Sequence, residues 1–153
     1  MKARAPQLAG VAGVAAVAIV LDQLSKSWAL SALDDHSIDL VLGARFALTF
    51  NSGAAFSIGS GRPALFAAVA VLTVVALSVF VARSPLNRAR TVAFGLIIGG
   101  ALGNVVDRVF RDHGGKVVDF IDLGWWPVFN VADSWLFIGV VVMLVDAWRE
   151  DRA

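Results

Sequence analysis

Residues 63 to 82 read PALFAAVAVLTVVALSVFVA, a run without a charged side chain. A helix rises about 1.5 Å per residue, so a run of this length crosses the ~30 Å hydrocarbon layer of a bilayer. Pro63 stands at the first position, where a helix tolerates proline because the missing N–H would have no partner there. The stretch therefore predicts a transmembrane helix.

The rest of the chain has the same apolar character. Hydrophobic residues make up 58% of the 153, and the mean hydropathy is +0.76, above the roughly half-apolar composition of soluble domains. Residues 8 to 30, 91 to 109 and 132 to 148 are also long enough to span a membrane. The first of these has the apolar core of a signal peptide, but no A-x-A-like site follows it, so we interpret it as an uncleaved span. We predict one integral membrane domain over residues 1 to 153, an all-α membrane protein with four transmembrane helices.

The distribution of basic residues predicts the orientation. With four spans, both termini and the loop between the second and third spans share one side, and their Lys and Arg residues predict that this side is cytoplasmic. The opposite side also carries bases but holds most of the acids, so the bias is moderate. Residues 31 to 62 and 110 to 131 are then expected outside. The cytoplasmic bases are Lys2, Arg4, Arg83, Arg88, Arg90, Arg149 and Arg152.

The first outer stretch predicts a small extracytoplasmic β-hairpin. IDLVL and RFALTF alternate apolar and polar residues on either side of Gly43 and Ala44, with Gly43 expected at the first turn position. A two-stranded sheet is marginal in isolation. We therefore expect it to lie on the membrane or over the helix ends.

Several chemistries are disfavoured. The chain has no cysteine, which excludes a thiol nucleophile and disulfides. The bases are scattered, so no nucleic-acid surface is predicted. His36 and His113 lack the HExxH spacing of a zinc peptidase. Ser25 and Ser27 flank Lys26 directly, and adjacent residues do not face each other on a helix, which argues against a Ser-Lys pair.

Polar residues inside the spans need partners. In the third span, Gly95, Gly99 and Gly103 form one line that ends at Asp107, and Gly100, Asn104 and Arg108 form the neighbouring line. The glycines predict close helix packing. Asn104, Asp107 and Arg108 form either a structural polar clasp or part of a site, because such groups are costly in a membrane. Asp22 and Lys26, an i, i+4 pair in the first span, predict an ion pair.

Two outer carboxylates are the candidates for catalysis. Asn130 and Asp133 fit the N-cap of the fourth helix, and Asp119 in VVDFIDL could be a solvated strand acid. A cap would explain only one of them. If both meet in one site, they share a proton and titrate as a pair. The ionised member could then take a proton from water while the protonated member polarises a carbonyl, as in aspartic proteases.

Five motifs, in order, resemble those of lipoprotein signal peptidase, also called signal peptidase II. They cover nearly the whole chain, and their joint occurrence is far more specific than any one of them. The motifs are DQLSK at 22 to 26, TFNSGAAFS at 49 to 57, GGALGNVVDR at 99 to 108, VVDF at 117 to 120 and FNVADS at 129 to 134.

The resemblance implies an aspartic endopeptidase in the bacterial inner membrane. Such an enzyme removes the signal peptide of a prolipoprotein at the outer face, just before a cysteine that carries a diacylglyceryl group. No metal or organic cofactor is implied, the partners are the lipid-modified substrate and membrane lipid, and we expect a monomer. The implied roles are catalysis for Asp119 and Asp133, substrate binding for Asn51, Gly53, Asn104, Arg108 and Asn130, and support of the site for Asp22 and Lys26.

Two alternatives come from other classes. A small transporter could use Asp22 and Lys26 as a proton or cation relay. Transporter sites tend to lie near the bilayer midplane, whereas the acids of this chain are expected to cluster at the outer ends of the spans. A purely structural helical subunit would use its polar residues for packing alone. Neither alternative explains the placement of Asp119 and Asp133.

Overall fold

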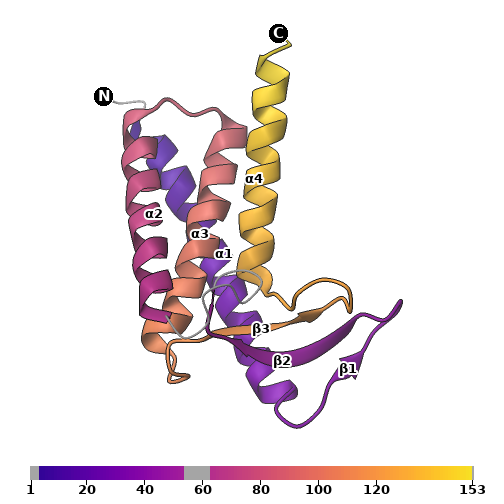
Figure 1. The fold of residues 1–153 in the computed structure, drawn as a ribbon. Helices are drawn as coiled ribbons and strands as arrows, with labels where there is room; N and C mark the ends of the chain where they lie inside the picture. The colour runs from indigo at the N-terminus through magenta and orange to yellow at the C-terminus, as the bar shows by residue number, and fades with distance from the viewer. Residues whose placement is uncertain (1–3, 54–62, 153) are drawn as a thin grey trace.

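The computed structural model describes residues 4–53 and 63–152. It has four long helices side by side and a small sheet at one end of the bundle (Figure 1). All four helices are long and apolar enough to cross a membrane, which confirms the predicted fold class. The elements are α1 (Arg4–Ala32), β1 (Ile38–Asp39), β2 (Arg45–Asn51), α2 (Pro63–Arg83), α3 (Arg88–Phe110), β3 (Val117–Asp122) and α4 (Val131–Glu150).

Helix α3 is the centre of the bundle, and glycines from its two lines of residues face two different helices. A Cβ added at Gly99 would lie 2.7 Å from the Cβ of Ala18 in α1, and one at Gly100 would lie 2.5 Å from the carbonyl oxygen of Ala132 in α4. Only glycine permits these close approaches. The predicted role of the glycines in packing is confirmed, and the two lines explain how α3 holds α1 and α4 together.

Helix α2 packs against α1 and α3 through its C-terminal half. Val81 of α2 joins Val11 of α1 and Phe94 of α3 in a buried apolar cluster. The side chain of Gln7 donates to the carbonyl oxygens of Val81 and Ser84 at 3.1 and 2.8 Å, which ties the start of α1 to the end of α2. This end of the bundle holds the start of α1, the end of α4 and the α2–α3 loop, and the sheet lies at the opposite end (Figure 1).

The sheet has three antiparallel strands in the order β1-β2-β3. The predicted hairpin is present, with Ile38 paired to Phe46, and the strand expected in VVDFIDL pairs with its second strand. The expected position of Gly43 in the turn is wrong. Leu42 and Gly43 are the two central residues, with φ of 59° and 79°, and the N–H of Ala44 donates to the carbonyl oxygen of Val41 at 3.2 Å. Gly43 therefore takes the second central position of a turn that needs positive φ at both.

The sheet packs over the C-terminal end of α1. Trp28 of α1 meets Phe46 of β2 edge to face, with ring centroids 5.4 Å apart, and meets Phe120 of β3 at 6.0 Å. Ala29, Leu33 and Phe120 are buried in the same apolar cluster. These contacts fix β3 against the bundle, so the residues of β3 lie at a defined place above the ends of α3 and α4.

Candidate active site

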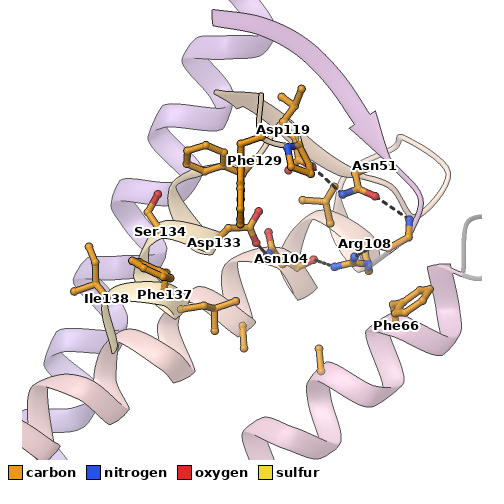
Figure 2. Close-up of a pocket in the computed structure, with 18 of the residues that line it drawn as sticks. Asn51, Phe66, Asn104, Arg108, Asp119, Phe129, Asp133, Ser134, Phe137 and Ile138 are labelled. Atoms are coloured by element: carbon orange, nitrogen blue, oxygen red, sulfur yellow. Dashed lines mark hydrogen bonds between the residues drawn. The ribbon is translucent and has the colours of Figure 1, made fainter. Parts of the chain in front are cut away.

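The pairing of β2 with β3 brings two distant polar residues together. Asn51 at the end of β2 pairs with Val117, and Thr49 pairs with Asp119. The amide nitrogen Nδ2 of Asn51 donates to Oδ2 of Asp119 at 2.9 Å (Figure 2). The other end of the same amide, Oδ1, accepts from the N–H of Gly53 at 2.9 Å. Asn51 thus holds the carboxylate of Asp119 and the start of the chain that leaves the sheet.

The start of α4 supplies the second carboxylate. The N-cap residue Asn130 accepts from the N–H of Asp133 through Oδ1 at 3.0 Å, and its own N–H donates to Oδ2 of Asp133 at 3.4 Å. This reciprocal arrangement is a capping box. Asn130 also donates through Nδ2 to Oδ1 of Asp119 at 2.6 Å. The cap and the site are therefore not alternatives, because one side chain serves both.

Asn104 of α3 completes the link between the two carboxylates. Its Nδ2 donates to Oδ1 of Asp133 at 2.9 Å, and its Oδ1 accepts from Nδ2 of Asn130 at 3.2 Å. Asp119 and Asp133 are thus joined through the side-chain amides of Asn130 and Asn104, and their carboxylates face a common space (Figure 2). Elements from three parts of the chain meet here as the sequence predicts.

Burial changes the acidity of Asp119, which is only 1% exposed. Loss of water around the carboxylate and the neighbouring charge of Asp133 raise its pKa to about 7, although the amides of Asn51 and Asn130 favour the ionised form. A carboxyl group with this pKa can hold or release a proton near neutrality. This is the property that acid–base chemistry requires.

Arg108 lies one helical turn beyond Asn104 and contacts the chain that leaves β2. Its Nη2 donates to the carbonyl oxygen of Gly53 at 2.8 Å, and its Nη1 donates to the carbonyl oxygen of Asn104 at 3.3 Å. The Nε of Arg108 is buried and has no hydrogen-bond partner among the described residues. The guanidinium group therefore retains a donor next to the two carboxylates.

A cavity of about 870 Å³ opens beside these groups. Polar side chains form one part of its wall, and the remainder is apolar and comes mainly from α2, α4 and the loop after β3. Figure 2 shows Phe66 of α2 across the cavity from the two carboxylates. The cavity separates α2 from α4 and can take a largely apolar molecule with a polar segment. Its wall includes Asn51, Gly53, Phe66, Val69, Ala70, Thr73, Asn104, Arg108, Asp119, Trp125, Trp126, Asp133, Leu136, Phe137 and Ile138.

A second group of buried charges lies beneath the site. Nζ of Lys26 is 2.9 Å from Oδ2 of Asp22 and 2.9 Å from Oδ2 of Asp107, and all three side chains are fully buried. The predicted Asp22–Lys26 ion pair is confirmed. The sequence allowed two roles for the polar residues on α3, a structural clasp or part of a site, and each role applies to different residues. Asp107 joins Asp22 and Lys26 in a buried clasp, whereas Asn104 and Arg108 line the cavity.

Comparison with known proteins gives consistent results. A model of the family described as "Signal peptidase (SPase) II" matches residues 14–149. The chain belongs to the signal peptidase II family. The protein named "Lipoprotein signal peptidase" of Syntrophomonas wolfei is 43% identical over 141 residues, covering 88% of this chain and 92% of that protein. The protein of the same name from Shewanella amazonensis is 41% identical over 146 residues, covering 89% of this chain and 85% of that protein.

Solved structures agree with the sequence comparison. One bacterial membrane enzyme superposes with a TM-score of 0.80 at 32% identity, covering 90% of this chain and 87% of the other. A second superposes with a TM-score of 0.75 at 33% identity, covering 88% and 89%. Membership of the signal peptidase II family argues against the transporter and the structural-subunit interpretations. It agrees with the resemblance that the five motifs predict.

Two further residues that contact the buried group of Asp22, Lys26 and Asp107 were not predicted. Gln23 donates through Nε2 to Oδ2 of Asp22 at 3.1 Å and to Oδ1 of Asp107 at 3.0 Å. Arg111 donates through Nε to Oδ1 of Asp107 at 3.1 Å. The i, i+4 spacing of Asp107 and Arg111 was a signal for that pair, whereas nothing in the spacing of Gln23 marks its role. Residues 54 to 57 of the motif TFNSGAAFS lie outside the described residues.

Proposed function

We propose that this chain is an aspartic endopeptidase that removes signal peptides from lipid-modified prolipoproteins, with Asp119 and Asp133 as the catalytic pair. Membership of the signal peptidase II family supports the activity. One structural observation carries the assignment of the residues. Two carboxylates on β3 and α4 are linked by Asn130 and Asn104 and face the same cavity, and Asp119 has a pKa of about 7.

The pair hydrolyses the peptide bond by moving one proton at a time. Asp133 lies in the first turn of α4, where the helix dipole favours negative charge, so we assign it as the base. It takes a proton from water while the oxygen of that water bonds to the scissile carbonyl carbon. Asp119, which holds the shared proton, donates it to the carbonyl oxygen. When the C–N bond breaks, Asp133 returns its proton to the leaving amine nitrogen, and the hydroxyl proton of the intermediate returns to Asp119.

The cavity wall matches the two parts of such a substrate. The free Nε of Arg108 and the amides of Asn51, Asn104 and Asn130 can bind carbonyl groups of an extended peptide near the scissile bond, and Gly53 provides backbone there. The apolar wall between α2 and α4 can take the acyl chains of the diacylglyceryl group without removing them from the membrane. This placement supports cleavage next to the lipidated cysteine.

Orientation and assembly complete the proposal. Both termini lie in the cytoplasm, the site faces outward, and the enzyme resides in the bacterial inner membrane as a monomer of one domain. Asp22 and Lys26 support the site from α1. Membrane lipid surrounds the four spans and shares the apolar wall with the substrate.

Labelling of introduced cysteines tests the orientation in a chain that has none of its own. Cysteines at Arg88 and Arg152 should react only with a reagent on the cytoplasmic side, and a cysteine at Asp35 only with a reagent outside. Labelling of positions 35 and 88 from the same side would contradict the topology.

The activity is tested with a matched pair of precursors. The purified protein is incubated with a lipidated prolipoprotein and with its unlipidated twin, and release of the signal peptide is measured. We expect cleavage of the lipidated precursor before the modified cysteine and little cleavage of its twin. Failure to cleave either would remove support for the peptidase assignment.

A further inference from the structure

The buried clasp of Asp22, Lys26 and Asp107 contacts backbone N–H groups immediately before each of the two proposed catalytic residues. Oδ1 of Asp22 accepts from the backbone N–H of Ala132 at 2.9 Å, and Oδ2 of Asp107 accepts from the backbone N–H of Val118 at 3.0 Å. Ala132 directly precedes Asp133, and Val118 directly precedes Asp119. Each acid of the clasp therefore holds the residue before one member of the pair.

Lys26 joins these two contacts. Its ammonium group is 2.9 Å from Asp22, 2.9 Å from Asp107 and 2.9 Å from Oδ1 of Asn104. Asn104 in turn donates to Asp133. Three short contacts to one buried cation fix the relative positions of α1, α3 and the side chain that bridges to the site. Hydrogen bonds with an ionised partner are about twice as strong as neutral ones, so these links resist displacement.

We propose that Asp22, Lys26 and Asp107 are positioning residues that set the separation and angle of Asp119 and Asp133, and this inference rests on the proposed function. One acid holds the start of α4 and the other holds the start of β3, while Lys26 holds both acids. The distance between the two catalytic carboxylates is therefore set by the clasp, although no clasp side chain bonds to either carboxylate. The network does more than neutralise buried charge.

A purely structural clasp predicts different behaviour. If the three charges only stabilised the bundle, any change would lower thermal stability and leave the kcat of the folded enzyme unchanged. If they position the pair, a small displacement lowers kcat and leaves KM nearly unchanged, because the substrate-binding wall is intact. A misplacement of about 1 Å costs on the order of 100-fold in rate.

Gly103 of α3 offers a test that removes no charge. A Cβ at this position would lie 2.5 Å from Oδ2 of Asp22, so Gly103→Ala displaces that carboxylate. Gly13 of α1 has nothing within 4 Å of an added Cβ, which makes Gly13→Ala the matched control. We expect Gly103→Ala to lower kcat by roughly 100-fold with KM within about twofold. Gly13→Ala should keep the wild-type kcat.

Two substitutions at Asp22 distinguish the role of its backbone contact from the role of its charge. Asp22→Asn and Asp22→Ala lose the same charge, but only asparagine keeps an oxygen that can accept from the N–H of Ala132. The Asn variant should therefore retain about tenfold more kcat than the Ala variant, a difference of one lost hydrogen bond and its geometry. Asp107→Asn tests the arm that holds Val118. Asp146→Asn, which breaks an ion pair with Arg90 at the cytoplasmic end, controls for loss of stability alone.

The outcomes separate this inference from the proposed function. Wild-type protein that fails to cleave the lipidated precursor overturns the function. If the wild type cleaves, and Gly103→Ala, Asp22→Ala and Asp107→Asn all keep kcat within about twofold of Gly13→Ala and Asp146→Asn, the clasp is only structural and the inference is wrong. A fall in kcat without a rise in KM, together with partial rescue by asparagine at position 22, supports it.

Discussion

Two groups of carboxylates lie toward the sheet end of this bundle (Figure 1), and they differ in their partners. In the clasp, Asp22 and Asp107 each lie 2.9 Å from the ammonium group of Lys26. In the proposed catalytic pair, Asp119 and Asp133 receive their side-chain hydrogen bonds from amides of asparagine. The two groups are connected, because Asn104 accepts from Lys26 and donates to Asp133.

The difference shows how one fold can use the same residue type for two purposes. A cation in direct contact favours the ionised carboxylate and holds it in place, which suits a structural link. An amide binds a carboxylate without supplying a charge, so a neighbouring negative charge and burial can still raise the pKa, as they do at Asp119. The two groups of acids therefore differ in partner chemistry, with a cation in the clasp and asparagine amides in the proposed catalytic pair.

The largest expected effect is on activity, at the proposed catalytic pair. Asp119→Asn and Asp133→Asn keep the side-chain size but remove the group that carries the shared proton, so each should lower the rate of signal-peptide release by about 10⁴-fold or more. The double variant should be little slower than either single one, because the two residues act as a unit. Position 133 can still cap α4 as asparagine, so that variant should purify normally. Substantial residual activity in either single variant would reassign that residue to the cap or the strand.

The next largest effect is on stability at the clasp. Lys26→Met removes the buried cation and leaves Asp22 and Asp107 without their shared partner, which should cost roughly 3–5 kcal/mol of stability. Asp146→Asn, at a pair whose side chains are 29% and 13% exposed, should cost less than about 1 kcal/mol. Thermal unfolding of the purified variants in detergent measures both. Equal losses would mean that the clasp is an ordinary ion pair.

A smaller effect is expected at Arg108. Arg108→Lys keeps the charge but loses the planar group that reaches the carbonyl oxygens of both Gly53 and Asn104. We expect cleavage of the lipidated precursor to fall by about tenfold, with a thermal stability close to that of the wild type. If the rate of cleavage by Arg108→Lys equals that of the wild type, Arg108 has only a structural role.

The smallest effect is expected in the loop after α1. Asp35 is 2.7 Å from His36, and its side chain is 91% exposed. The partner lowers the pKa of Asp35, but an exposed pair contributes little to stability. Asp34→Asn and Asp35→Asn should therefore leave the rate of cleavage within about twofold of the wild type and leave the thermal stability nearly unchanged. A large loss of activity would extend the site beyond the clasp and the proposed catalytic pair.

The sequence predicts much of this arrangement because several signals are local. Apolar length predicts the four helices, the i, i+4 spacing predicts the contact of Asp22 with Lys26, and the position of Asn130 before an apolar run predicts a cap. Local spacing does not reveal long-range pairing. The register of β2 against β3, which brings Asn51 to Asp119, depends on which strands meet in space. The contacts of Asp22 and Asp107 with backbone N–H groups also lack a sequence signal, because any residue can supply the donor.

The pH dependence of kcat/KM tests most directly the claim that the asparagine-bound pair shares a proton. Asp119 has a pKa of about 7, so the free enzyme keeps the proton below that pH and loses it above. The same sign applies to stability: the folded state binds more protons than the unfolded chain between the ordinary Asp pKa of 3.8 and about 7, so this group's contribution to stability falls as pH rises across that window. With a lipidated precursor, we predict that kcat/KM declines as pH rises through about 7, while Asp146→Asn shows the same profile as the wild type. A kcat/KM that stays constant or increases from about pH 6 to about pH 9 would contradict the account.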